Sequence, residues 1–212
     1  MSSWFYQFVG GLLLMLLPIA AQAATPKTIL AYGDSLTAGY QLKPGEGFAP
    51  QLEAALRARG HDVKVVMGGV SGDTTAQGRA RIGWTLGAMK SPPDLVVLEL
   101  GANDMLRGQS PATARANLDA MIADFKARGS RVVLAGMLAQ PNLGAAYVKE
   151  FNAIYPSLAK KHQVALYPFF MDGVATVKGL QLDDGLHPTA EGVKVIVRRI
   201  LPLVEKELAK SG

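Results

Sequence analysis

Two short segments at opposite ends of the chain contain residue types that can together perform nucleophilic chemistry. Ser35 lies in the run Gly-Asp-Ser-Leu after an apolar stretch, and His187 follows Asp184 by three residues. A histidine oriented by a carboxylate can take the proton of a serine hydroxyl, which then attacks a carbonyl carbon. Each segment also has an ordinary interpretation, Ser35 as a helix N-cap and His187 as a surface histidine before a helix.

Other residues compete for the roles of acid and base. Asp183 adjoins Asp184, so either carboxylate could orient the histidine. His61 lies in an expected helix-to-strand turn, and His162 follows two lysines at an expected helix end. Neither of these histidines has a carboxylate three residues before it, although Asp62 adjoins His61. His187 is therefore the preferred base.

Two glycine-containing turns offer hydrogen-bond donors for a negatively charged oxygen. Gly72 lies in a glycine-rich run over residues 68–75, and Asn103 follows the run Glu-Leu-Gly-Ala. A backbone N–H and a side-chain amide can stabilise a tetrahedral acyl intermediate, and one such donor contributes about 3 kcal/mol. Both residues can equally be turn formers, with Asp73 and Asp104 acting as caps.

Apolar runs recur five times along the chain and predict the elements that must position these residues. Near-continuous Val, Ile and Leu indicates strands buried on both faces, as in a parallel sheet. The five runs are residues 28–33, 63–67, 95–100, 131–137 and 164–167. With amphipathic segments between them, they predict a three-layer α/β/α sandwich around a five-stranded parallel sheet. Functional groups would then gather at the carboxyl ends of the strands.

Glycine and proline mark the expected ends of several helices. Gly60 and Gly129 are expected to end the helices that precede the second and fourth apolar runs, because glycine readily adopts the left-handed conformation after a helix. Pro188 is expected to begin the last helix, since proline is favoured in the first turn.

Composition limits the classes of function. The chain has 212 residues, 49% hydrophobic and 18% charged, which suits one globular domain. Cysteine is absent, which excludes a thiol nucleophile and a cysteine-based metal site. The net charge of +5 is spread with mixed signs, so no nucleic-acid partner is expected. A nucleotide-binding protein is also disfavoured, because the first turn lacks G-x-G-x-x-G and the chain contains no P-loop motif.

The first 26 residues carry no charged side chain and contain an apolar run from Phe8 to Leu17. The small-x-small sequence Ala-Gln-Ala that ends at Ala23 predicts a signal peptide over residues 1–23, followed by one domain over residues 24–212. The protein is then expected in the periplasm or outside the cell. Because the segment lacks Lys and Arg, an uncleaved membrane anchor remains the alternative.

The four segments, in this order, resemble the blocks of the SGNH (GDSL) hydrolase family over nearly the whole chain after residue 23. Residues 33–40, 71–75, 99–108 and 184–188 are similar to its subgroup of bacterial acyl-CoA thioesterases, lysophospholipases and arylesterases. Ala102 stands where many relatives of this subgroup have glycine, which concerns substrate range more than mechanism.

The resemblance implies the flavodoxin-like SGNH hydrolase fold and a role for each candidate residue. Ser35 is the expected nucleophile and first oxyanion donor, Gly72 and Asn103 are the other donors, Asp184 orients the imidazole, and His187 is the base. The implied substrates are small carboxylic esters, including aryl esters and lysophospholipids, and acyl thioesters. Neither a metal ion nor an organic cofactor is implied.

Apolar residues beyond the strands are candidates for an acyl-binding groove. These substrate-binding candidates are Met105, Leu106, Leu143 and Tyr147. Phe169 and Met171 are favoured as core residues instead. The expected protein is a monomer that has no stable membrane insertion once the signal peptide is removed.

Two other functions remain as alternatives. A sugar or envelope-polysaccharide O-acetyl esterase would keep the same site, but few aromatic residues near the expected crevice could form a sugar platform. A non-catalytic acyl-binding module should have lost the nucleophile, the base or the oxyanion donors, and the sequence has lost none of them.

Overall fold

The computed structural model describes residues 25–210. The signal peptide expected over residues 1–23, with its cleavage site after Ala23, lies outside these residues. Between residues 25 and 210, no helix has both the length and the apolar character needed to cross a membrane.

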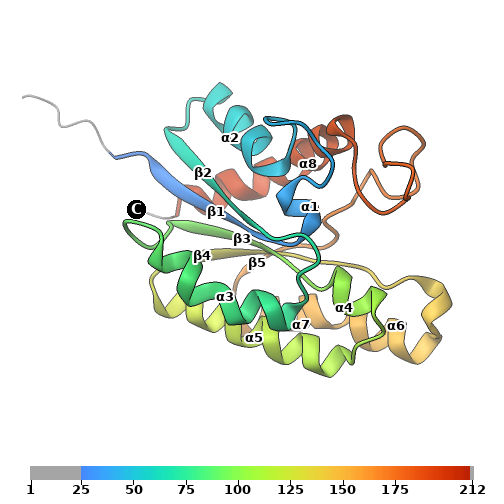
Figure 1. The fold of residues 1–212 in the computed structure, drawn as a ribbon. Coiled ribbons are helices and arrows are strands. Elements are labelled where there is room, and N and C mark those ends of the chain that lie inside the picture. Colours follow the sequence, from blue (N-terminus) through green and yellow to red (C-terminus); the bar gives the residue numbers. More distant parts are fainter. Residues whose placement is uncertain (1–24, 211–212) are drawn as a thin grey trace, which may run out of the picture.

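Five parallel strands form one sheet in the order β2-β1-β3-β4-β5 (Figure 1). They are β1 (Lys27–Gly33), β2 (Val63–Gly69), β3 (Leu95–Glu99), β4 (Arg131–Ala135) and β5 (Ala165–Tyr167). Every residue of β3 is buried, as expected for a strand covered on both faces. All five strands are where the apolar runs predict them, and each end lies within two residues of the expected one.

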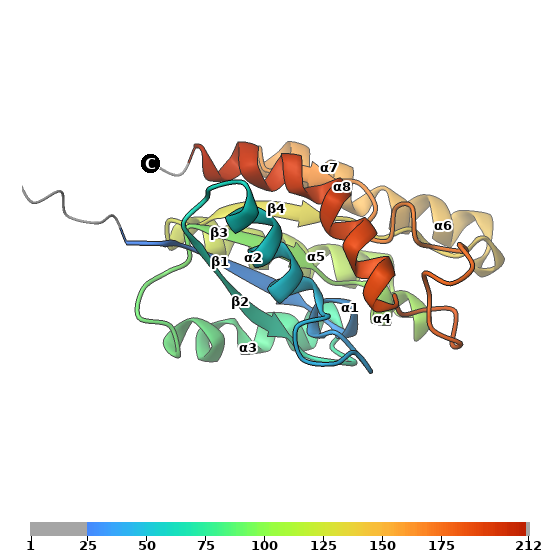
Figure 2. The same ribbon diagram turned by 90° about the horizontal axis from the view of Figure 1, so that it is seen from above.

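Helices cover both faces of the sheet, so the molecule has the three layers that the sequence predicts (Figures 1 and 2). One layer contains α2 (Phe48–Ala58) and α8 (Ala190–Leu208). The other contains α3 (Thr75–Gly87), α5 (Pro111–Ala127), α6 (Ala145–Asn152) and α7 (Ile154–His162). Three short elements lie at the carboxyl edge of the sheet, namely α1 (Ser35–Ala38), α4 (Ala102–Leu106) and the 3-10 helix η1 (Pro141–Leu143).

Aromatic pairs join both helical layers to the sheet and to the loops at its carboxyl edge. Tyr32 of β1 packs edge-on against Phe125 of α5, with ring centroids 5.4 Å apart. Phe48 of α2 contacts Phe170 in the same way at 5.1 Å. All four side chains are at most 1% exposed, so a close-packed core supports the loops that carry the site.

The helix ends agree with the sequence patterns except at the last helix. Gly60 and Gly129 follow α2 and α5 in the left-handed conformation, with φ of 87° and 88°. The expected start of the last helix at Pro188 is wrong, because α8 begins at Ala190. Thr189 is its N-cap and accepts a hydrogen bond from the N–H of Gly192, whereas Pro188 forms an antiparallel bridge with Gln181. A threonine cap satisfies a helical N–H that proline cannot.

The strand order places a crevice beside β1. The segment after β1 leads to the layer that contains α2, and the segment after β3 leads to the layer that contains α5 (Figure 1). Adjacent parallel strands whose connections leave on opposite faces form a crevice at their carboxyl ends. Ser35 follows β1 and Asn103 follows β3, so these two candidate residues flank the crevice.

Candidate active site

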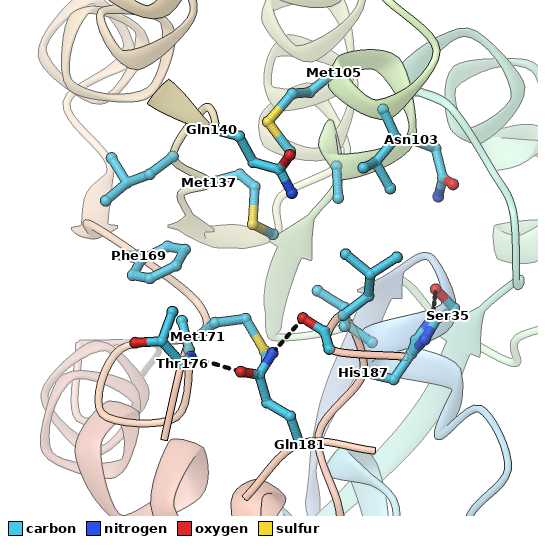
Figure 3. A pocket seen from close by; sticks show the side chains of 17 residues that line it. Ser35, Asn103, Met105, Met137, Gln140, Phe169, Met171, Thr176, Gln181 and His187 are labelled. Carbon is cyan, nitrogen blue, oxygen red and sulfur yellow. Dashed lines mark hydrogen bonds between the residues drawn. The ribbon is translucent and has the colours of Figure 1, made fainter. Parts of the chain in front are cut away.

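Ser35 is the first residue of α1 and directly follows the turn after β1. The N-cap of this helix is Asp34, whose Oδ1 accepts a hydrogen bond from the N–H of Leu36 at 3.0 Å. The ordinary interpretation of Ser35 as the N-cap is therefore wrong, and its hydroxyl is free for another role. The Oγ of Ser35 lies 2.9 Å from Nε2 of His187, although the two residues are 152 positions apart (Figure 3).

The other ring nitrogen of His187 faces Asp184, with Nδ1 and Oδ2 2.6 Å apart. The Oδ1 of Asp184 accepts hydrogen bonds from the N–H groups of Leu186 and His187, at 2.8 and 3.0 Å. Partial burial acts to raise the pKa of Asp184, but these backbone bonds and the imidazole outweigh it and lower the pKa to about 2. Asp184 is therefore an ionised acceptor at neutral pH.

The competing residues have other partners. His61 contacts Glu205 of α8 through Nε2 at 3.1 Å, and His162 contacts Asp119 of α5 at 2.5 Å. Of the two adjacent aspartates, it is Asp184 that contacts the imidazole of His187. Among residues 25–210, the Ser35–His187–Asp184 arrangement is thus the one in which a serine, a histidine and a carboxylate are joined.

The amide of Asn103 contacts the turn that contains Gly72, the other predicted oxyanion donor. Gly72 has φ of 86°, a conformation that favours glycine. Within the described residues, the backbone N–H groups of Ser35 and Gly72 have no hydrogen-bond acceptor. The Nδ2 of Asn103 donates to Oδ2 of Asp34 at 3.2 Å and to the carbonyl of Asp73 at 3.0 Å. To donate to a substrate oxygen, the Asn103 amide must therefore share one of these two hydrogen bonds with the substrate or break it.

Buried polar contacts fix these turns relative to one another. Asp104 was a possible cap of its own loop, but its carboxylate accepts hydrogen bonds from the N–H and hydroxyl of Thr75, at 2.8 and 2.6 Å. Asp73 was a possible cap of α3, but Thr74 is the N-cap. Asp73 instead pairs with Arg81, which also donates to the carbonyl of Gly33. Arg81 thereby joins the turn of Gly72 to the turn before Ser35, a role for which the sequence carries no local signal.

Two carboxyl groups are fully buried directly behind the nucleophile. Asp34 and Glu99 are both 0% exposed. The Oε2 of Glu99 accepts a hydrogen bond from the hydroxyl of Thr37 at 2.8 Å and a longer one from the N–H of Asp34 at 3.4 Å. Burial raises the pKa of Asp34 to about 6 despite the hydrogen bond from Leu36. Burial and the neighbouring carboxylate of Asp34 raise the pKa of Glu99 well above its usual range.

We expect the substitution Glu99→Gln to stabilise the protein at pH 8. The pKa of Glu99 is higher in the folded than in the unfolded protein, so the wild type loses stability as the pH rises above about 4.3, the usual pKa of glutamic acid. Glutamine stays neutral and still offers an oxygen to Thr37. The free energy of unfolding by urea should be higher in the variant by at least about 1 kcal/mol at pH 8, and the difference should shrink toward pH 5.

Glu150→Gln, at an exposed position of α6, is the matched control and should change the free energy of unfolding little at either pH. A wild type more stable than Glu99→Gln at pH 8, or a difference that does not depend on pH, would show that Glu99 is charged and well paired in the folded protein.

A cavity of about 350 Å³ lies beside the serine and histidine (Figure 3). Its labelled apolar side chains are Met105, Met137, Phe169 and Met171. Phe169 and Met171 were favoured as core residues, and Met171 is indeed 4% exposed, yet both line this cavity. Met137 and Gln140, which follow β4, also line it and were not among the candidates.

Two of the four substrate-binding candidates line the cavity and two do not. Met105 and Leu106 follow Asn103 in α4 and line it. Leu143 and Tyr147 are not among its lining residues. Tyr147 stacks on Phe151 of the same helix at 5.9 Å between ring centroids and donates its hydroxyl to the carbonyl of Gln109, in the loop before α5.

The comparisons with known proteins agree with this geometry. Residues 31–195 match the model of the GDSL-like lipase/acylhydrolase family. The chain is 41% identical to an arylesterase of Vibrio mimicus, over 91% of this chain and 93% of the relative. It is 34% identical to the thioesterase 1/protease 1/lysophospholipase L1 of Escherichia coli K12, over 92% and 93%.

A solved structure leads to the same assignment. The chain is similar to the crystal structure of AlinE4, an SGNH-hydrolase family esterase, with a TM-score of 0.74 and 45% identity. The likeness covers 87% of this chain and 98% of that one. The family match spans the end of β1, the strands β2 to β5, the turn of Ser35 and the loop of His187. The chain therefore belongs to the GDSL-like lipase/acylhydrolase family and is a hydrolase.

Proposed function

We propose that the protein hydrolyses carboxylic esters and acyl thioesters through an acyl-enzyme formed on Ser35. The observation that carries the proposal is the placement of His187, whose two ring nitrogens face Ser35 at 2.9 Å and Asp184 at 2.6 Å beside an apolar cavity. A base within hydrogen-bond reach of a serine and oriented by a carboxylate is the arrangement that activates a serine nucleophile.

In the first half of the reaction, Nε2 of His187 takes the proton of Ser35 as Oγ attacks the acyl carbonyl carbon. The carbonyl oxygen becomes negatively charged and accepts hydrogen bonds from the N–H groups of Ser35 and Gly72 and from the amide of Asn103. The intermediate collapses when the bond to the leaving oxygen or sulfur breaks. His187 gives its proton to the departing alcohol or thiol, and the acyl group stays on Ser35.

In the second half, a water molecule replaces the leaving group. His187 takes a proton from the water, and the hydroxide attacks the carbonyl carbon of the acyl-enzyme. The new oxyanion uses the same three donors, and collapse breaks the bond to Oγ of Ser35. The proton returns from His187 to Ser35, which releases a carboxylic acid and restores the enzyme.

The choice of esters and thioesters is supported by the names of the relatives and by the cavity. One relative is named an arylesterase and another a thioesterase and lysophospholipase. Methionines, leucines and a phenylalanine line the cavity, which suits an acyl chain better than a sugar. A sugar O-acetyl esterase is therefore the weaker alternative. A non-catalytic acyl-binding module would not require the hydrogen-bonded arrangement of Ser35, His187 and Asp184.

Labelling with a fluorophosphonate probe tests the proposed function. The probe forms a covalent bond to an activated serine, and peptide mapping identifies the residue. We expect modification of Ser35 alone, together with turnover of p-nitrophenyl and acyl-CoA substrates by the unlabelled protein. Modification of another serine, or an unlabelled protein without hydrolytic activity, would overturn the proposal.

The cavity predicts a preference for acyl chains longer than acetyl. Each buried methylene contributes about 0.8 kcal/mol, so kcat/KM should be at least about tenfold higher for p-nitrophenyl octanoate than for the acetate. Ala175 lines the cavity and is half-buried, so the larger ring in Ala175→Phe should remove most of this preference while acetate turnover stays similar. Equal rates on acetyl, octanoyl and palmitoyl esters would contradict the prediction.

We further propose that residues 1–23 direct export and that the protein acts as a monomer in the periplasm or outside the cell. The sequence of the segment, with its apolar run and small residues at 21 and 23, supports export. Intact-mass measurement of the exported protein should give a chain that begins at Ala24, and a full-length mass would favour the membrane-anchored alternative.

A further inference from the structure

The ring of Tyr40 lies against the ring of His187. Their centroids are 4.4 Å apart and their planes are inclined by 36°. Tyr40 itself is 40% exposed, so burial of its own surface gives little reason for this placement. The contact joins the segment that follows Ser35 to the loop that carries His187, and neither composition nor spacing predicts it.

The backbone around Tyr40 is unusual in a way that favours this placement. Gly39, before it, has φ of 79° and is the left-handed cap of α1. A β-carbon at Gly39 would lie 3.1 Å from the Cα of Gly47. Gln41, after it, has φ of 58°, which is uncommon for a residue other than glycine. Backbone strain of this kind persists where the surrounding structure enforces it and is concentrated at functional sites.

The backbone of Tyr40 is also attached to the nucleophile segment. Its N–H donates a hydrogen bond to the carbonyl oxygen of Ser35 at 3.1 Å. Tyr40 therefore cannot shift relative to Ser35 without the loss of this bond. Tyr40, bonded through its backbone to Ser35 and with its ring against that of His187, restrains the distance between the two reacting side chains.

The hydrogen bonds of His187 leave one motion of its ring unrestrained. Ser35 and Asp184 hold the two ring nitrogens in place. The ring can still tilt about the line that joins these nitrogens, and a contact on the ring face is needed to prevent that motion. His187 lines the cavity and Tyr40 does not. The ring of Tyr40 provides a contact of this kind on the imidazole. An aromatic face also attracts the positive charge that the imidazole gains when it takes the proton of Ser35.

We propose that Tyr40 is a positioning residue for His187: its ring face holds the imidazole in line with Ser35 and stabilises the imidazolium. This inference rests on the proposed function. The aromatic ring of Tyr40 positions the imidazole and the hydroxyl does not, so Tyr40→Phe should retain the activity of the wild type. The effect should fall on the chemical step and leave substrate binding unchanged.

The test compares Tyr40→Leu, Tyr40→Phe and the wild type in the hydrolysis of p-nitrophenyl butyrate. Rates are expressed per active site titrated with the fluorophosphonate, so that misfolded protein does not count. We expect Tyr40→Leu to lower kcat about tenfold with KM within about twofold of the wild type, and Tyr40→Phe to keep kcat within about twofold. The rate constant for labelling of Ser35 should fall with kcat, because it depends on the same proton transfer.

Trp84→Leu is the matched control, since Trp84 is 78% exposed on α3 and does not line the cavity. It should change neither kcat nor the labelling rate. A Tyr40→Leu variant with the kcat of the wild type would overturn the inference, and so would an unchanged kcat with a raised KM, which would make Tyr40 a substrate contact. An equal fall in Tyr40→Phe would assign the effect to the hydroxyl and overturn it as well.

These outcomes are separable from failure of the proposed function. If the wild type is not labelled at Ser35, the hydrolytic mechanism itself is wrong, whatever the Tyr40 variants do. If Ser35 is labelled and Tyr40→Leu behaves as the wild type, only the role of Tyr40 is wrong.

Discussion

Replacement of Ser35 by alanine is expected to lower kcat/KM for p-nitrophenyl octanoate by about four orders of magnitude or more. The variant loses the oxygen that forms the acyl-enzyme, and no other serine lies within reach of His187 in the part of the chain that the structure describes. The cavity, His187 and the N–H groups of the turn all remain. Residual activity should therefore come only from substrate binding and water attack near the oxyanion donors.

The fold should tolerate this change, because His187 is the only partner of the Ser35 hydroxyl among residues 25–210, and Asp34 rather than Ser35 caps α1. Thermal unfolding should accordingly differ by no more than a few degrees. Ser110→Ala is the matched control: Ser110 is exposed at the start of α5, and its side chain makes no capping bond. Activity of Ser35→Ala close to that of Ser110→Ala would rule out Ser35 as the nucleophile.

Much of the fold could be predicted because it depends on local sequence patterns. The near-continuous apolar runs predict the five strands, since most positions of a strand covered on both faces are apolar. The start of α8 was less predictable because two local signals compete there. Pro188 and Thr189 are both favoured near a helix start, and the bridge of Pro188 to Gln181 decides between them. That bridge depends on the fold of the whole loop, which the residues next to Pro188 do not specify.

The site was predictable where its residues stand in short motifs and unpredictable where distant segments meet. Asp184 and His187 contact each other across one turn, so their spacing alone suggests the pair. Arg81 reaches Asp73 and Gly33 from within α3, and its sequence neighbours give no hint of this. Tyr147 has the character of a pocket residue, but the packing of α6 directs it to Phe151. Side-chain direction depends on tertiary packing, which a single sequence does not specify.

The two buried carboxyl groups illustrate how the site constrains the sequence. Asp34 both caps α1 and accepts the hydrogen bond of the Asn103 amide, so it links the nucleophile to an expected oxyanion donor. Glu99 lies beside it and contacts Thr37. Proteins retain unfavourable burial of this kind where rigid placement of neighbouring groups matters for function. A gain in stability from Glu99→Gln would agree with that view.

The substitution Asp184→Asn is expected to lower kcat by about three orders of magnitude, even though the two side chains have the same size. The Oδ1 of Asp184 accepts two backbone N–H groups, and Oδ2 faces Nδ1 of His187. An asparagine must keep its oxygen toward the backbone donors, because an amide NH₂ cannot accept a hydrogen bond. Its NH₂ then points at Nδ1 and donates to it.

That geometry forces the wrong tautomer on His187. With Nδ1 accepting a hydrogen bond, the ring proton sits on Nε2, which can no longer take the proton of Ser35. Asp183→Asn removes the adjacent exposed carboxylate and keeps Asp184, so it should retain the activity of the wild type. A large loss in Asp183→Asn with little loss in Asp184→Asn would exchange the roles of the two residues.

The pH dependence separates this loss of orientation from a simple loss of charge. The pKa of Asp184 is about 2, below its unfolded value of about 3.9, so the stabilisation it gives is present above pH 3.9 and is lost as the pH falls through about 2. Asp184 therefore stays ionised across the working range, and its titration cannot cause a loss of activity near neutral pH. Because asparagine imposes the wrong tautomer at every pH, the kcat of Asp184→Asn should be low throughout pH 6–9, and recovery at either end of that range would contradict the tautomer argument.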